Sequence, residues 1–283
     1  MAGAEESGRA AFRVAAVPVA AARRERSLTE PASVMRHGAQ SARAFFEDRA
    51  GKAALTPVRY AIYLTTPRDA ALTEAARRWL GRCAFTGETT PAEAPAEAGA
   101  AVPARYGWHA TMRAPFRLRD GADEAALVAA FRDFRAGHGP VEARLRVARL
   151  SRFVALVAED QSEIEALQVS ALHAFEPFRA PLSPADRARR NPDRLDDRGR
   201  ELLDMWGYPQ VMERFRFHMT LSGPVEGDEL ARVEAAARDY FAPFTAEPQQ
   251  LVFGLYAEPE AGGPFTIVDV DGDRVTEAGR LAS

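Results

Sequence analysis

The sequence predicts an α+β fold with two lobes, each a sheet backed by helices. Strand-like and helix-like segments follow one another irregularly from about residue 57 onward. Two neighbouring strand-like segments have the pattern of an antiparallel hairpin, which a doubly wound parallel sheet would not contain. A strand that carries His, one apolar residue and Thr, followed by a capped helix, occurs twice. This repetition indicates an internal duplication.

Composition limits the class of protein. The chain has 283 residues, 47% of them hydrophobic and 27% charged, which is ordinary for a globular protein. Its net charge of −3 argues against a dedicated nucleic-acid binder but allows a small anionic ligand in a local basic cleft. The single cysteine, Cys83, excludes a disulfide within the chain and a multi-cysteine metal site.

The first 56 residues differ in character from the rest. Residues 1–56 are rich in Ala and Arg, and we expect a disordered extension followed by a single bilobal domain over 57–283. Val14–Ala22 has some character of a signal peptide, but Ala is weakly apolar and Pro18 interrupts it. Met35 is an alternative start. No apolar run is long enough to cross a bilayer, so we expect a cytoplasmic protein.

The first half of the domain is expected to begin with a strand at Arg59–Thr65. Asp69 is expected to cap the following helix. The Pro- and Ala-rich segment Thr89–Ala104 is predicted to be a flexible loop. The first His-Thr strand should run from Arg105 to about residue 118, and Asp123 should cap the next helix.

A hairpin and a third helix come next. Val141–Leu150 alternates as a half-buried strand, and Arg152–Ala158 is its expected partner. Ser162 and Glu165 are predicted to form a capping box at the start of a helix. The charge-dense segment Leu182–Gly207 is expected to be partly helical.

The C-terminal part repeats the His-Thr arrangement. Arg214–Ser222 alternates apolar and polar residues as a half-buried strand. Asp228 is expected to cap the helix after it. Leu251–Ala257 and Phe265–Val270 are predicted to be two closing strands.

The two His-Thr pairs suit phosphodiester chemistry. Side chains at i and i+2 on a strand point the same way, about 6–7 Å apart, so His109 and Thr111 can reach one group. His218 and Thr220 can do the same from the other lobe. One neutral imidazole can act as general base and one protonated imidazole as general acid. The hydroxyls can donate to the non-bridging phosphate oxygens.

A solvated strand face and a metal site are the two competing hypotheses for the His-Thr segments. A lone His-x-Thr segment is usually only a solvated face, but here two copies occur, each with an aromatic residue before the His. A histidine metal site would need a third or fourth ligand, and the strand faces offer only Thr, Ser and Arg. We expect the other histidines, His37, His138 and His173, to lie in the extension, in a turn and on a solvated helix face.

The motifs His109-Ala110-Thr111-Met112 and His218-Met219-Thr220-Leu221 resemble the His-h-Thr-h signature of the two-histidine (2H) phosphoesterase superfamily, where h is apolar. Longer strings around them, such as R-Y-G-W-H-A-T-M-R-A-P-F-R-L and R-F-H-M-T-L-S-G-P, resemble the branch associated with bacterial phosphonate-utilisation operons. The likeness covers about residues 58–270. It implies a bilobal fold with antiparallel-rich sheets and a central cleft that binds cyclic phosphates without metal or other cofactor.

The resemblance also implies roles for individual residues. His109 and His218 would be the catalytic acid and base, with Thr111 and Thr220 on the phosphate. The fifth motif position, often Ser or Thr in the family, holds Ser222 in the second motif and Arg113 in the first. We expect both to contact substrate, with Arg113 pointing into the cleft by strand alternation. Tyr63, on a neighbouring strand, is a further candidate for substrate binding, although a core role is the commoner one.

The predicted function is hydrolysis of a small cyclic phosphate by a metal-independent phosphodiesterase. A ribosyl cyclic phosphate from phosphonate catabolism is the substrate that the resemblance favours. The alternatives are an RNA-end 2′,3′-cyclic phosphodiesterase or ligase, and a non-catalytic binder of phosphorylated metabolites. RNA and membrane partners are not favoured. The substrate, the oligomeric state and the division of acid and base roles stay open.

Overall fold

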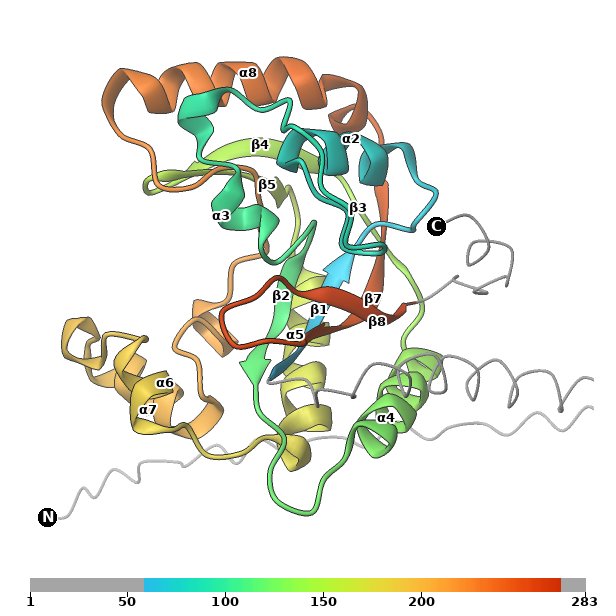
Figure 1. The fold of residues 1–283 in the computed structure, drawn as a ribbon, viewed down its shortest axis with the longest axis vertical. Coiled ribbons are helices and arrows are strands. Elements are labelled where there is room, and N and C mark those ends of the chain that lie inside the picture. Colours follow the sequence, from blue (N-terminus) through green and yellow to red (C-terminus); the bar gives the residue numbers. More distant parts are fainter. Residues whose placement is uncertain (1–58, 271–283) are drawn as a thin grey trace, which may run out of the picture. The chain divides into compact units, whose positions relative to one another are not determined.

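The computed structural model describes residues 59–270, which form an α+β fold with two antiparallel sheets (Figure 1). The predicted extension over residues 1–56 lies outside the described residues. Within residues 59–270, the helices are all too short or too polar to cross a bilayer.

The first sheet has the strand order β2-β1-β7-β3, with β8 also paired to β7. Its strands are β1 (Arg59–Thr65), β2 (Ala110–Phe116), β3 (Val141–Ala143), β7 (Gln249–Glu258) and β8 (Thr266–Val270). β3 and β8 share one side of β7: β3 pairs with its first residues and β8 with its later ones. All these pairings are antiparallel.

The second sheet has the order β4-β5-β6. Its strands are β4 (Leu145–Leu150), β5 (Phe153–Ala158) and β6 (Met219–Thr220). β4 and β5 form the predicted hairpin, in continuous register from Leu145 opposite Ala158 to Leu150 opposite Phe153. The second His-Thr strand is much shorter than predicted: a 3-10 turn covers Met212–Arg214, and pairing begins only at Met219.

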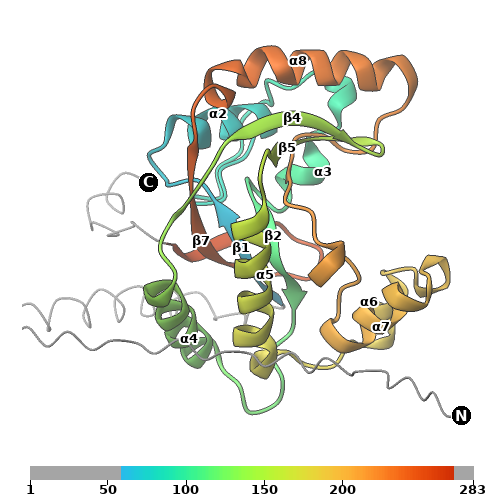
Figure 2. The same cartoon turned by 180° about the vertical axis from the view of Figure 1, so that it is seen from behind.

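Helices cover one side of each sheet. α4 and α5 lie side by side against the first sheet, and α8 lies along β4 and β5 (Figure 2). The helices are α2 (Ala71–Leu80), α3 (Ala101–Ala104), α4 (Glu124–Gly137), α5 (Ser162–Phe175), α6 (Pro184–Ala188), α7 (Asp197–Trp206) and α8 (Gly227–Thr245). α6 and α7 occupy the segment that was expected to be partly helical.

β1 shows how the pattern of the sequence becomes a two-sided sheet. Tyr60, Ile62 and Leu64 point to the large core beneath the helices, whereas Ala61 and Tyr63 pack into a smaller cluster on the opposite face. All five side chains are at most 1% exposed. The strand is therefore buried on both sides, and Tyr63 lies on the face away from the helices.

Helix starts were predicted with mixed success. Asp123 caps α4 as expected, because its carboxylate accepts a 2.7 Å hydrogen bond from the backbone N–H of Ala126. The expected cap at Asp69 is wrong: the N-cap of α2 is Ala70, whose side chain has no acceptor.

Two further caps were misplaced. Ser162 is the first residue of α5, and its N–H and hydroxyl donate to Asp160 at 2.9 and 2.6 Å. α8 begins at Gly227 with Glu226 as N-cap, so the expected cap at Asp228 is also wrong. In both cases the N-cap is a polar residue one or two positions before the residue that was expected: Gln161 for α5 and Glu226 for α8.

The segment predicted to be a flexible loop packs onto the domain over its second part. It forms the 3-10 turn η1 (Ala96–Ala98) and α3, and Ala98 is fully buried. The carbonyl of Ala98 accepts a 2.7 Å hydrogen bond from the N–H of Gly223, just after the second motif. The small side chains that suggested low complexity allow this close approach.

Candidate functional site

The two His-Thr segments lie on different sheets, each at the start of a strand. His109 immediately precedes β2, and Thr111 within that strand pairs with Tyr63 of β1. His218 immediately precedes β6, and Thr220 pairs with Ala155 of β5. His109, Thr111, His218 and Thr220 are all half-buried.

The two imidazoles are held in the same way. Nδ1 of His109 lies 2.9 Å from the carbonyl oxygen of Gly107, and Nδ1 of His218 lies 2.7 Å from the carbonyl oxygen of Arg216. A carbonyl oxygen can only accept a hydrogen bond, so each Nδ1 carries the proton. Nε2 of each ring is left to accept or donate a proton elsewhere.

Buried hydrogen bonds fix the backbone around His109. The carbonyl of Trp108 accepts from the hydroxyls of Thr65 at 2.9 Å and Tyr256 at 3.0 Å. The indole N–H of Trp108 donates to Thr66 at 3.0 Å. These contacts come from β7 and from the end of β1, so the sheet itself sets the position of the imidazole.

Gly107 makes this geometry sterically feasible. Its φ of +75° is in the left-handed region, and a Cβ there would lie 2.4 Å from Cβ of Ala84. Only glycine therefore brings its carbonyl to the His109 ring without a local shift.

The backbone of the second segment is also held on both sides of its histidine. The N–H of Phe217 donates to the side-chain oxygen of Gln161 at 2.9 Å. The indole of Trp79, on α2, donates to the carbonyl of Leu221 at 2.8 Å. The N-cap of α5 and the side chain of α2 thus fix the chain before and after His218.

His109 lies among aromatic rings, and its burial lowers the pKa of its imidazole. The rings of Tyr63 and Tyr106 lie 4.3 and 5.6 Å from the His109 ring, centroid to centroid. Burial lowers the pKa of His109 from 6.5 to about 4, against the hydrogen bond to Gly107, which raises it. Charge on His218 lowers the pKa of His109 further.

Tyr63 packs beside the His109 ring, 4.3 Å away between ring centroids. Its side chain is 1% exposed, and no residue in the described part of the chain accepts or donates a hydrogen bond at its hydroxyl. Buried tyrosine hydroxyls usually have a partner. Burial also raises the pKa of Tyr63 well above its usual value, so the hydroxyl stays a neutral donor.

Arg113 does not share the face of Thr111. Thr111 pairs with Tyr63, but the next pair in β2 is Arg113 with Ile62, which leaves Met112 as an extra residue in a β-bulge. Residues directly opposite each other point to the same face. Arg113 therefore lies on the Ile62 face, and the prediction from simple alternation is wrong because alternation does not hold through a bulge.

Arg113 is instead buried beside the end of α5. Its side chain is 1% exposed and forms an ion pair with Glu176, with its guanidinium 5.7 Å from the ring centroid of Phe116. Among the described residues, none accepts a hydrogen bond from its Nη1.

Ser222 also has a structural place. It is fully buried, and its hydroxyl accepts from the N–H of Val154 at 2.9 Å and donates to the carbonyl of Gly223 at 2.8 Å. Its hydrogen bonds join β5 to the end of the second motif. The Ser222 hydroxyl is therefore already used within the protein and is not available for the expected contact with substrate.

Sequence reasoning missed Tyr106 and Tyr256, one beside the His109 ring and the other on the Trp108 carbonyl. The aromatic residue three positions before the first His was the available signal for Tyr106. For Tyr256 there was none, because its β7 strand reaches the site only through β1.

The other titratable groups do not form a metal cluster. Residues 59–270 contain no group of three or more His, Cys, Asp or Glu side chains arranged to hold an ion. His138 stacks on Phe134, and His173 is exposed with its ring against Trp206. His37 lies outside the described residues.

Comparison with known sequences gives a family and two named relatives. The family model described as "Protein of unknown function (DUF1045)" matches residues 111–266. The chain is 35% identical over 217 residues to a Laribacter hongkongensis protein named "Ribose 1,5-bisphosphate phosphokinase PhnN", which covers 74% of this chain and 50% of the relative. It is 34% identical over 223 residues to a protein of the same name from Janthinobacterium sp. (strain Marseille), covering 73% and 49%. The chain thus spans about half the length of these relatives.

Proposed function

We propose that this chain, which belongs to the DUF1045 family, is a phosphodiesterase of the 2H class that opens a small cyclic phosphate without a metal ion. The observation that carries the proposal is the paired geometry of the imidazoles. Each has Nδ1 committed to a carbonyl two residues earlier, each has Nε2 available, and the charge on one affects the other. A Thr hydroxyl follows each His on the same strand face.

The proposed reaction is a hydrolysis in which one His acts as general base and the other as general acid. One His removes a proton from water, whose oxygen attacks phosphorus. The bond from phosphorus to one ring ester oxygen breaks, and the second His donates its proton to that oxygen. The products are a phosphate monoester and a hydroxyl group, and proton exchange with solvent restores both imidazoles. The Thr111 and Thr220 hydroxyls donate to the non-bridging oxygens as their charge grows.

We assign the base and acid roles to the two histidines from their different surroundings. We assign the base to His109, because a pKa of about 4 keeps its Nε2 unprotonated near neutral pH. We assign the acid to His218, on the opposite sheet. Tyr63 is proposed to donate its free hydroxyl to the phosphate or the sugar.

A ribosyl cyclic phosphate is the proposed substrate. The relatives are named for ribose 1,5-bisphosphate. Opening a ribose 1,2-cyclic phosphate that also carries a 5-phosphate, by cleavage at the 2-oxygen, would produce that compound. The chain would then act one step before such a kinase, in phosphonate breakdown as the family resemblance implies.

The kinase activity in the relatives' name is assigned to the part of those proteins outside the match. The chain covers only 50% and 49% of them. Its sequence also contains no G-x-x-x-x-G-K-[S/T] segment, the glycine-rich loop with which many kinases hold nucleotide phosphates. Incubation with ATP and ribose 1,5-bisphosphate tests this assignment, and phosphate transfer by the chain would overturn it.

The decisive experiment measures hydrolysis of a panel of cyclic phosphates in excess EDTA. The panel contains ribose 1,2-cyclic phosphate with and without a 5-phosphate, and nucleoside 2′,3′-cyclic phosphates. We expect turnover of the ribose compounds that survives EDTA and falls by at least about 100-fold in His109→Ala and in His218→Ala. His173→Ala is the matched control and should retain full activity, because this ring lies on an exposed helix face.

Four results would count against this function. Preference for nucleoside 2′,3′-cyclic phosphates would favour the RNA-end enzyme. Activity that EDTA abolishes, or that neither histidine substitution changes, would refute the two-histidine mechanism. Tight binding of panel members by the wild type without turnover would leave a non-catalytic binder.

A further inference from the structure

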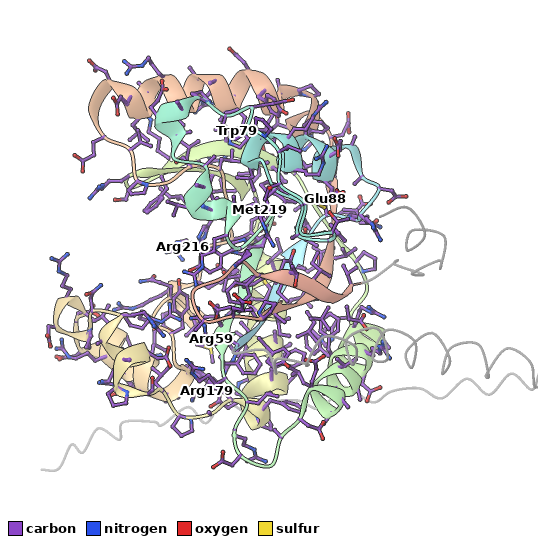
Figure 3. All side chains as sticks on the ribbon, viewed as in Figure 1. Arg59, Trp79, Glu88, Arg179, Arg216 and Met219 are labelled. Carbon is purple, nitrogen blue, oxygen red and sulfur yellow. The ribbon has the colours of Figure 1, made fainter. Side chains whose placement is uncertain are left out.

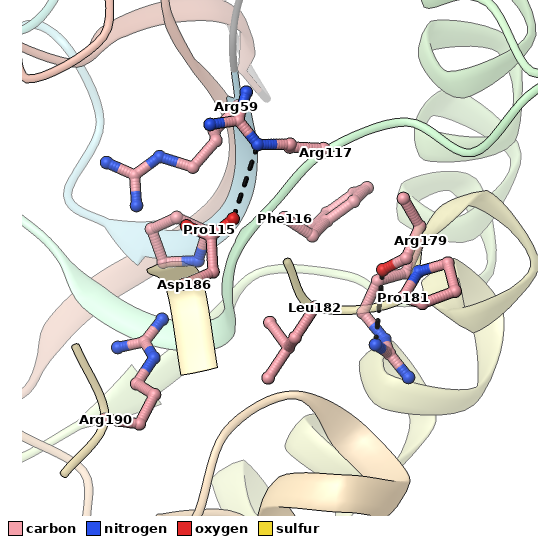
Figure 4. Close-up of a pocket in the computed structure, with 10 residues that line it drawn as sticks. Arg59, Pro115, Phe116, Arg117, Arg179, Pro181, Leu182, Asp186 and Arg190 are labelled. Carbon is pink, nitrogen blue, oxygen red and sulfur yellow. Dashed lines mark hydrogen bonds and ion pairs between the residues drawn. The ribbon is translucent and has the colours of Figure 1, made fainter. Parts of the chain in front are cut away.

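A pocket rich in arginine lies at the end of β2 away from His109. Its walls include Arg59, Arg117, Arg179 and Arg190, and Asp186 is the one acidic residue that lines it (Figure 4). In Figure 3, Arg59 and Arg179 lie below Met219, which follows His218 in the chain. The pocket is therefore separate from both His-Thr segments, although two of its lining residues, Arg59 and Phe116, belong to the sheet whose strand β2 begins just after His109.

Carboxylates hold two of these guanidinium groups in place without using all their donors. Glu258 accepts from Nε and Nη2 of Arg59 at 2.5 and 2.7 Å. Glu176 accepts from Nη2 and Nε of Arg179 at 2.6 and 3.1 Å. An arginine has five N–H donors, so further donors on Arg59 stay available to an anion in the pocket.

Arg190 supplies charge that no carboxylate balances. In the described range, no Asp or Glu lies within ion-pair distance of its side chain, which instead lies over the ring of Tyr208 at 4.8 Å. Arg117 contributes a fourth guanidinium, 3.4 Å from Asp186. Glu258, Glu176 and Asp186 each pair with one of the other three arginines, so the charge of Arg190 leaves the pocket net positive. Planar guanidinium groups also match the oxygens of phosphate.

One wall of the pocket, Arg59, lies on the same face of the first sheet as Tyr63, whose ring packs against His109. Arg59 and Tyr63 are four residues apart on β1, so their side chains point the same way, with their Cα atoms about 13 Å apart at the strand rise. Arg59 lies 5.7 Å from the ring of Phe265, which stacks on Tyr106 at 5.4 Å, and Tyr106 borders His109. A continuous series of aromatic contacts, through Phe265 and Tyr106, therefore connects Arg59 to the imidazole of His109.

We propose that this arginine pocket binds a second phosphate group of the substrate, so that the chain prefers a sugar cyclic phosphate carrying a further phosphate monoester. The inference rests on the proposed function for the identity of the reacting end. The cyclic phosphate lies between His109 and His218, the sugar crosses the aromatic rings, and the terminal phosphate reaches Arg59 and Arg190. Arg113 shares the carboxylate of Glu176 with Arg179, but its side chain is 1% exposed and does not line the pocket, so we give it no direct contact with this phosphate.

The test compares ribose 1,2-cyclic phosphate with and without a 5-phosphate in Arg190→Gln. We expect the ratio of the two kcat/KM values to fall at least about tenfold, through the doubly phosphorylated substrate alone, because a charge-assisted contact is lost. Arg194→Gln is the matched control: Arg194 is exposed, lies four residues further on and does not line the pocket. Arg190→Lys keeps the charge without the planar fork and should give an intermediate ratio.

Direct binding of ribose 5-phosphate, measured by calorimetry, separates this inference from the proposed function. Binding by the wild type and by Arg194→Gln, lost in Arg190→Gln, would support the pocket even if no cyclic phosphate were hydrolysed. An unchanged kcat/KM ratio in Arg190→Gln, or ribose 5-phosphate binding equal to that of the wild type, would overturn it. Equal thermal midpoints for the two Gln variants exclude unfolding as the cause.

Discussion

The buried ion pair of Arg113 and Glu176 makes a sharp test of the β-bulge in β2. The Arg113 side chain is 1% exposed, and that of Glu176 is 33% exposed. Glu176→Gln keeps the size of the side chain but leaves the buried guanidinium without its counter-charge. Loss of one partner of a fully buried pair costs about 3–5 kcal/mol. Because solvent reaches Glu176, we expect a smaller loss of about 2–3 kcal/mol in the free energy of unfolding.

Arg113→Met should behave oppositely, since it removes the buried charge together with the Nη1 group that has no partner among the described residues. Glu176 keeps Arg179 as an ion-pair partner, and the long Met side chain fills most of the space. We expect a change in unfolding free energy within about 1 kcal/mol, because replacing a buried charge by an apolar group of similar volume is often neutral. Combining both substitutions should recover most of the stability that Glu176→Gln loses.

Urea denaturation measures these differences as shifts of the midpoint at constant slope. The kcat/KM of Arg113→Met for the preferred cyclic phosphate should equal that of the wild type. A rise in KM of about tenfold or more with folding intact would mean that the guanidinium contacts substrate. Equal destabilisation by Arg113→Met and Glu176→Gln would show that the ion pair is not buried as described.

His109, Gly107 and Tyr63 each carry a further prediction. With the pKa of His109 lowered to about 4, its base form persists down to about pH 5, so kcat/KM should fall on the acid side only as the pH approaches 4, as a pH–rate profile would show. Gly107→Ala forces a contact with Ala84 and should lose about 1–3 kcal/mol of unfolding free energy and most of the activity. Gly121→Ala is its control, because Gly121 also has a positive φ but open space around it; in urea denaturation and the hydrolysis assay it should lose only about 1 kcal/mol and no activity. Tyr63→Phe should leave the thermal midpoint unchanged but reduce kcat/KM about threefold to tenfold, and an unchanged kcat/KM would remove its hydroxyl from the site.

Local periodicity was sufficient to predict much of the fold. Alternation over Val141–Leu150 and Arg152–Ala158 predicted the β4–β5 hairpin, although β3 separates from β4 at Arg144. The cap at Asp123 was predicted correctly because its carboxylate accepts from the N–H of Ala126, only three residues later in the chain. These features depend on neighbours in sequence, which is the information that a pattern contains.

The errors arise where distant contacts decide the backbone. The bulge at Met112 is accompanied by a hydrogen bond from Gln168 of α5 to the Met112 carbonyl at 3.4 Å, and the pattern of β2 alone does not contain that contact. The Ala-rich segment before α3 was predicted to be flexible because its composition is simple. It is held by backbone hydrogen bonds to the end of α2 and by one from Gly223, more than a hundred residues away.

The same limit explains why the sequence predicts two equivalent histidines, whereas the proposed base and acid roles depend on their surroundings in the fold. The two motifs are nearly identical as strings, and both rings are fixed by the carbonyl two residues earlier. Their surroundings differ: tyrosine rings pack against His109, whereas within residues 59–270 no aromatic ring contact is made by His218. Burial is the main cause of the low pKa of His109. Under the proposed mechanism, a duplicated motif can therefore supply both a base and an acid once its two copies lie on different sheets with different neighbours.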